Sequence, residues 1–135
     1  MQSMVLPKFI MRTTGDMNLD EYFLNIPSIL VCCDVDRNAM HTFKSALEMA
    51  GNKPCVHMED DIILCDNFVG KILDEIKKRP DDVIQFFSMR KDDLTIGSRY
   101  INGGLFSMNQ CFYLPAGMSA GILTYMDEWT RYEEH

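Results

Sequence analysis

Apolar residues along this chain fall into two alternating kinds of stretch, short runs typical of β-strands and longer segments with a helical repeat. The short runs predict strands at residues 8–12, 28–36, 82–89 and 111–115, with another inside 54–68. The longer segments predict helices at 18–25, 38–51, 68–79 and 117–135. This alternation predicts an α/β fold, a compact Rossmann-like sandwich with a mostly parallel sheet flanked by helices, and ligands at the carboxyl ends of the strands.

Capping and breaking residues define several of these elements. Asn38 is expected to cap the helix at 38–51 and Gly51 to end it, because Asn accepts hydrogen bonds from free helical N–H groups and Gly adopts left-handed backbone. Asp66 or Asn67 is expected to cap the helix at 68–79, which Pro80 then stops. The boundaries of the two central helices therefore follow from local chemistry.

Two segments carry expectations about exposure. The run at 28–36 is almost continuously apolar and ends in acids, which predicts a buried parallel strand that opens on a site. Residues 90–110 are polar and glycine-rich, which predicts a long loop inside a single domain spanning 1–135.

Composition and charge narrow the class of protein. The 135 residues are 47% hydrophobic and 24% charged, as in a globular domain, and no apolar run has the ~20 residues of a membrane span. The net charge of -7 argues against broad non-specific binding to nucleic acid. Five cysteines without a C-x-x-C pair suit buried thiols in a reducing compartment, so we expect a cytoplasmic protein.

The stretch "HMEDDI" at 57–62 is the main candidate for chemistry. Alternation along a strand places Glu59 and Asp61 on one face and Asp60 on the other. Two converging carboxylates suit Mg²⁺ or Mn²⁺, whereas the simpler alternative is an exposed acidic turn. His57, inside the strand, is expected to be a hydrogen-bonded structural residue.

At "VHMEDDIIL" followed by "DNF", the chain resembles family 25 glycosyltransferases, which include bacterial lipopolysaccharide enzymes, and related phage-encoded enzymes. The resemblance is strongest over residues 28–90. It implies a GT-A fold in which acidic residues hold a divalent ion against the diphosphate of a nucleotide sugar. The implied acceptor is a glycan or another hydroxyl, and for a phage enzyme in a bacterial host it can be a modified DNA base met by Arg90, Lys91 and Arg99.

The same resemblance assigns roles to individual residues. It implies Mn²⁺ or Mg²⁺ on Glu59 and Asp61, and donor contacts from Asp60. The further donor-binding candidates are Arg12, Thr13, Thr14, Asp34 and Asp36. The usual opening motif of the family is replaced by "FIMRTTG", and Asp92 and Asp93 are the nearest candidates for a catalytic base.

Two alternatives remain open. The run "ILVCCDVDRN" also resembles the nucleophile strand of haloacid-dehalogenase-type phosphatases, in which Asp34 would attack phosphorus and Asp36 act as the acid. The other alternative is a non-catalytic protein that uses a nucleotide-sugar fold to bind a partner.

Overall fold

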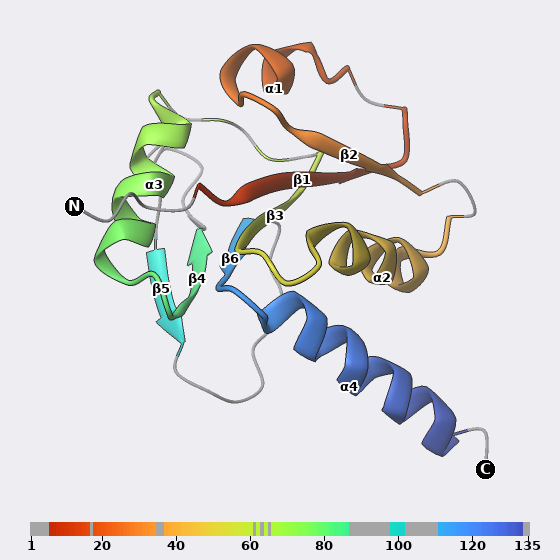
Figure 1. Cartoon of the computed structure of the whole chain (residues 1–135). Helices are drawn as coiled ribbons and strands as arrows, with labels where there is room; N and C mark the ends of the chain where they lie inside the picture. Colours follow the sequence, from red (N-terminus) through yellow and green to blue (C-terminus); the bar gives the residue numbers. More distant parts are fainter. Residues whose placement is uncertain are drawn as a thin grey trace.

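The chain forms one mixed β-sheet with helices on both faces (Figure 1). The computed structural model describes residues 6–16, 18–34, 37–60, 62, 64, 66–86, 98–101 and 111–133, and for 98–101 and 129–133 it describes the backbone alone. No helix within these residues is both long and apolar enough to cross a membrane.

Six strands in the described part of the chain make the sheet, in the order β2-β1-β3-β6-β4-β5. They are β1 (Lys8–Thr13), β2 (Leu30–Cys33), β3 (Cys55–Glu59), β4 (Val83–Phe86), β5 (Ser98–Ile101) and β6 (Cys111–Leu114). Strand β1 is parallel to both of its neighbours, with Arg12 in register with Cys32 on β2 and with Glu59 on β3. The ends of these three strands therefore lie at the same edge of the sheet.

The helices cover both faces of the sheet. They are α1 (Asp20–Asn25), α2 (Ala39–Ala50), α3 (Phe68–Lys78) and α4 (Met118–Glu133). Helices α1 and α3 pack against Met11 and Met58 on one face. Helix α2 covers Ile10 and Cys55 on the other face, where α4 also packs, against Phe112. Alternation along β1 and β3 thus gives each face its own apolar core, as the strand pattern predicts.

Local signals located the central helices well. Asn38 accepts a hydrogen bond from the backbone N–H of His41 at the start of α2, and Gly51 ends that helix with a positive φ of 61°. Asn67 occupies the N-cap position of α3 in left-handed backbone, but its side chain makes no capping hydrogen bond. The predicted caps of α2 are confirmed, whereas at α3 only the position of Asn67 is.

The prediction of a mostly parallel sheet is wrong, because the sheet is mixed. Strand β6 is antiparallel to β3 on one side and to β4 on the other, and β4 is also antiparallel to β5. All four residues of β6 are buried, so this apolar strand is covered on both faces in the middle of the sheet. It separates β3 from β4, which sequence order alone would have made neighbours.

Two further expectations need correction. Strand β2 is an edge strand with Cys32 as its one buried residue, and not the buried strand expected for 28–36. The predicted loop at 90–110 contains β5, which pairs with the edge of β4. Its four residues, "SRYI", show no clear alternation of apolar and polar side chains, so no local pattern predicts this strand. It is instead stabilised by its pairing with β4. The remainder of that segment lies outside the described residues.

The connections between the first three strands create a topological switch point. From β1 the chain crosses by α1 to β2 on one side, and then by α2 on the opposite face to β3 on the other side of β1. Such a reversal separates the two connections at the carboxyl ends of the central strands, and ligands of α/β proteins bind there. The fold therefore directs attention to the ends of β1 and β3.

Candidate functional site

A small open hollow of about 140 Å³ lies at the carboxyl ends of β1, β2 and β3. Its lining residues are Arg12, Thr13 and Thr14 from β1 and the turn after it, Asp34 after β2, Ala39 and Thr42 from α2, and Glu59 and Asp60 from the end of β3. Its volume is several times the ~30 Å³ that one water occupies, but below the roughly 300–1,000 Å³ of pockets that enclose a drug-sized molecule. The hollow suits a hydrated ion or a phosphate group.

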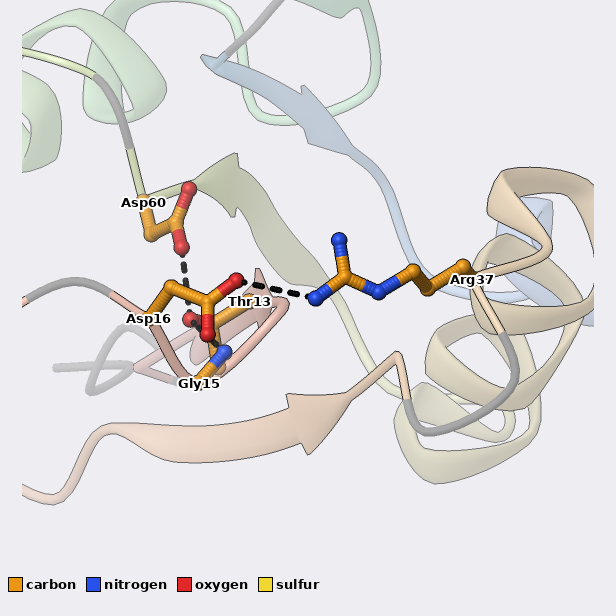
Figure 2. Close-up of polar contacts among 5 residues, drawn as sticks. All are labelled: Thr13, Gly15, Asp16, Arg37 and Asp60. Atoms are coloured by element: carbon orange, nitrogen blue, oxygen red, sulfur yellow. Dashed lines mark hydrogen bonds and ion pairs between the residues drawn. The ribbon is translucent and has the colours of Figure 1, made fainter.

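Thr13 joins the ends of all three parallel strands. Its hydroxyl donates to Asp60 Oδ2 at 2.6 Å and accepts from the backbone N–H of Gly15 at 3.0 Å (Figure 2). Its carbonyl accepts from the backbone N–H of Asp34 at 2.7 Å. With its side chain buried, Thr13 fixes the Asp60 carboxylate relative to β1 and β2.

Tyr22 holds the backbone of the acidic turn from the opposite side of the sheet from α2. Its hydroxyl contacts the carbonyl oxygens of Asp60, at 3.0 Å, and of Ile62. Tyr22 was not predicted from the sequence as a site residue, because it lies 38 residues before Asp60 and belongs to a different predicted element. No pattern in the sequence indicated that its hydroxyl reaches this turn.

Arg12 and Glu59 form the other side of the hollow. Arg12 Nη2 lies 3.5 Å from Glu59 Oε1, with the two side chains 15% and 39% exposed. The guanidinium carbon also lies 5.2 Å from the centre of the Phe43 ring, so the cation packs on an aromatic face. Glu59 is therefore paired with Arg12. This ion pair and the Thr13 hydrogen bond partly offset the repulsion between the adjacent carboxylates of Glu59 and Asp60.

The amino end of α2 forms the third side. Asp34 Oδ1 accepts from the backbone N–H of Asn38 at 2.9 Å, and the Asn38 side chain then accepts from the N–H of His41. Ala39 and Thr42 of the first turn line the hollow. The positive end of the helix dipole therefore faces it, which favours a bound anionic group.

An exposed ion pair connects two loops near this site. Arg37 Nη2 lies 3.3 Å from Asp16 Oδ2, joining the turn after β1 to the start of α2 (Figure 2). Arg37 has a positive φ of 52°, an uncommon conformation for a non-glycine residue. Both side chains are more than half exposed, so the pair contributes little to stability.

The charge of the hollow favours a cation. Among the described residues that line it, three carboxylates (Asp34, Glu59 and Asp60) face one guanidinium, which leaves two negative charges in excess. The described residues contain no group of three or more His, Cys, Asp or Glu placed to hold a metal ion. Mg²⁺ is nevertheless commonly bound by one or two carboxylates together with waters and substrate phosphates, and Asp60 and Glu59 fit that requirement.

His57 is a structural residue of the core, as expected. It is fully buried, stacks at 5.2 Å on Phe112, and its Nε2 lies 3.2 Å from Ser119 Oγ. Burial, and secondarily the positive charge of Arg12, lower the pKa of His57 to about 3. The neighbouring thiol of Cys55 is also buried, and burial raises its pKa to about 12, so neither side chain is ionised at neutral pH.

Six of the residues predicted from sequence line the same hollow. They are Arg12, Thr13, Thr14, Asp34, Glu59 and Asp60. The expectation that Asp60 lies on the face opposite Glu59 is wrong, because β3 ends at Glu59 and both side chains line the hollow. The other four, Asp36, Asp61, Asp92 and Asp93, lie outside the described residues.

Comparisons with known proteins add no relative. No family model matches the chain, and neither the curated proteins nor the solved structures contain a match.

Proposed function

We propose that this protein is a glycosyltransferase that moves a sugar from a nucleotide-sugar donor to a glycan or another hydroxyl acceptor, with Mn²⁺ or Mg²⁺ as cofactor, in the cytoplasm. The observation that carries the proposal is the convergence of six predicted donor and metal residues at the switch point of an α/β sheet. These residues belong to the ends of β1 and β3 or directly follow β1, β2 and β3.

A metal-bound diphosphate has a cation and negatively charged phosphate oxygens, and the site has separate groups of opposite charge for each of the two. Glu59, the predicted metal ligand, would hold the ion together with Asp60, for which the sequence predicted a donor contact instead. A bound ion would act as a Lewis acid on the leaving diphosphate. Arg12 and the amino end of α2 carry positive charge toward the hollow, where phosphate oxygens would lie. Thr14 and Asp34, which also line the hollow, would hydrogen-bond the rest of the donor. The predicted metal role of Asp61 and the catalytic roles of Asp92 and Asp93 rest on the sequence.

The size of the hollow supports the same division. At about 140 Å³ it accommodates an ion with a phosphate group, and not a complete nucleotide sugar. Most of the base and sugar would therefore lie outside the hollow.

The phosphatase alternative is less well supported. It requires Asp34 as a nucleophile, but Asp34 Oδ1 accepts a backbone hydrogen bond from Asn38, so the carboxylate helps to set the start of α2.

The test is a thermal-shift screen of UDP-, GDP-, CDP- and ADP-sugars with and without Mn²⁺, since a ligand that binds the native state raises its stability. We expect a shift that needs both the metal and one class of donor, followed by metal-dependent release of the nucleoside diphosphate. A shift without release would favour the non-catalytic binding protein. Hydrolysis of p-nitrophenyl phosphate without any response to nucleotide sugars would favour the phosphatase.

The variant Asp60→Asn isolates the charge of the site. The amide oxygen of Asn can still accept the hydrogen bond from Thr13, so the turn keeps its support while the negative charge is lost. We expect metal-dependent donor binding to fall by roughly tenfold, equivalent to ~1.4 kcal/mol. Asp74→Asn makes the same change on the exposed surface of α3 and should leave binding unchanged. Equal binding by both variants and the parent would overturn the metal role of Asp60.

A further inference from the structure

The acidic turn after β3 is held by a residue of α1. Helix α1 has six residues, too few to be stable alone in water, and Tyr22 is its buried side chain. Its neighbours Phe23 and Leu24 are 53% and 85% exposed. Tyr22 therefore anchors the helix to the core, together with Ile26 directly after its end.

The ring and the hydroxyl of Tyr22 have different partners. The ring belongs to the core cluster between the sheet and α3, against which Ile62 and Leu64 also pack. The hydroxyl is directed at two backbone carbonyls, those of Asp60 and Ile62, which lie on either side of one residue. A hydroxyl has a single proton, so the two carbonyls share it and are kept on the same side of the turn.

The support from Tyr22 complements the support from Thr13. Thr13 fixes the carboxylate of Asp60 through Oδ2, whereas Tyr22 fixes the backbone of the same residue. The backbone position of Asp60 and the direction of its side chain are therefore both fixed before any ligand binds. Removing a group that orients a metal-binding carboxylate in this way typically weakens metal binding by 10–100-fold.

We infer that Tyr22 is a positioning residue that holds the backbone carbonyls of Asp60 and Ile62 so that the Asp60 carboxylate faces the hollow ready to bind a divalent cation. The cation-binding part of this inference rests on the proposed function. The first link, from the Tyr22 hydroxyl to the turn, does not.

The test uses Tyr22→Phe, which keeps the ring and removes the hydroxyl. The matched control is Tyr113→Phe, because Tyr113 also donates a hydrogen bond from a buried ring to a backbone carbonyl, that of Pro80 at 2.7 Å. Tyr113 pairs with Val56, near the start of β3, and its hydroxyl reaches the turn before β4. Both variants lose one hydroxyl, but only the first loses it at the candidate site.

Two measurements test separately whether the Tyr22 hydroxyl holds the turn and whether the held turn strengthens cation binding. Carbonyl ¹³C chemical shifts report hydrogen bonding to the oxygen, so those of Asp60 and Ile62 should move in Tyr22→Phe and stay in place in Tyr113→Phe. Titration with Mn²⁺ alone, followed by electron paramagnetic resonance, should show binding that is weaker by roughly tenfold in Tyr22→Phe and unchanged in the control.

The outcomes are distinguishable. Unmoved carbonyl shifts in Tyr22→Phe overturn the inference whether or not the protein binds metal. Shifts that move while the affinity for Mn²⁺ stays at the parental value overturn the positioning role. If the parent itself does not bind Mn²⁺, both the metal site of the proposed function and the positioning role are overturned, and the carbonyl shifts still decide whether Tyr22 holds the turn.

Discussion

The Thr13 hydroxyl donates a 2.6 Å hydrogen bond to the Asp60 carboxylate, which connects the ends of two adjacent parallel strands. The partners are 47 residues apart in the chain. Because the same hydroxyl accepts from Gly15, one buried group orders both the turn after β1 and the acidic turn after β3. The candidate site is built on this connection.

Thr13→Val should therefore destabilise the protein. Valine has nearly the same shape but leaves the Gly15 N–H and the Asp60 carboxylate without the hydroxyl, at a cost of about 1–3 kcal/mol in the free energy of unfolding. Urea denaturation measures the change. Thr13→Ser should recover most of the loss, and Thr124→Val, on the exposed surface of α4, should stay within about 0.5 kcal/mol of the parent. A neutral Thr13→Val would show that the hydrogen bond contributes nothing.

The ion pair between Arg12 and Glu59 should contribute little to stability. At 3.5 Å, and with 39% of the Glu59 side chain exposed, it is largely screened by solvent. A double-mutant cycle with Arg12→Met and Glu59→Gln should give a coupling of about 0.2–1 kcal/mol that shrinks in 1 M salt. A coupling that is larger and insensitive to salt would mean that the pair is shielded from water and that Glu59 serves mainly to hold Arg12.

Packing on Phe43 distinguishes Arg12 from a lysine. The guanidinium carbon lies 5.2 Å from the ring centre, and the compact ammonium of lysine does not present the same broad, planar cation to the ring. Arg12→Lys should lower the free energy of unfolding by about 0.5–1 kcal/mol. In a Phe43→Leu background the same substitution should cost less. An equal cost in both backgrounds would exclude a contribution from the ring.

The buried His57 should make stability depend on pH. Its pKa is lowered from 6.5 to about 3 in the fold, first by burial and then by Arg12, so between these values the unfolded chain binds a proton that the folded chain does not. The stabilising contribution is complete above pH 6.5 and is lost as the pH falls toward 3, with a slope of up to about 1.4 kcal/mol per unit.

Urea denaturation at pH 6.5, 5.5 and 4.5 tests this dependence. His57→Gln, whose amide nitrogen can replace Nε2 as partner of Ser119, should reduce the slope by about one proton. His41→Gln changes an exposed residue of α2 and should keep the parental slope. The same slope in His57→Gln as in the parent would assign the acid sensitivity to other groups.

The cap of α2 should be worth about 1 kcal/mol. Asn38→Ala removes the side-chain acceptor for the His41 N–H, and N-cap losses typically cost 0.5–2 kcal/mol. Asn38→Ser should restore most of the stability, since its hydroxyl can accept the same hydrogen bond. Because α2 lines the hollow, any loss of donor binding in Asn38→Ala that Asn38→Ser restores would link the cap to the site.

Local interactions are what the sequence determined by itself. Asn38 and Gly51 mark the ends of α2 because capping and left-handed backbone depend on residues within one helical turn. The two faces of β1 and β3 follow from the alternation of neighbouring side chains. The six site residues that line the hollow were predictable for a related reason, since each follows directly on the end of a strand or belongs to that end.

Interactions between distant segments were decided by the tertiary structure. Strand β6 lies antiparallel between β3 and β4, and β5 pairs with β4. Both arrangements depend on which strand edges meet when the sheet assembles, and no local pattern encodes that choice. The same holds at the site. Thr13 and Tyr22 reach Asp60 across 47 and 38 residues, because the parallel strands and α1 bring their hydroxyls to one turn. Sequence spacing carries no information about such contacts, since they form only when the core has fixed the position of each element.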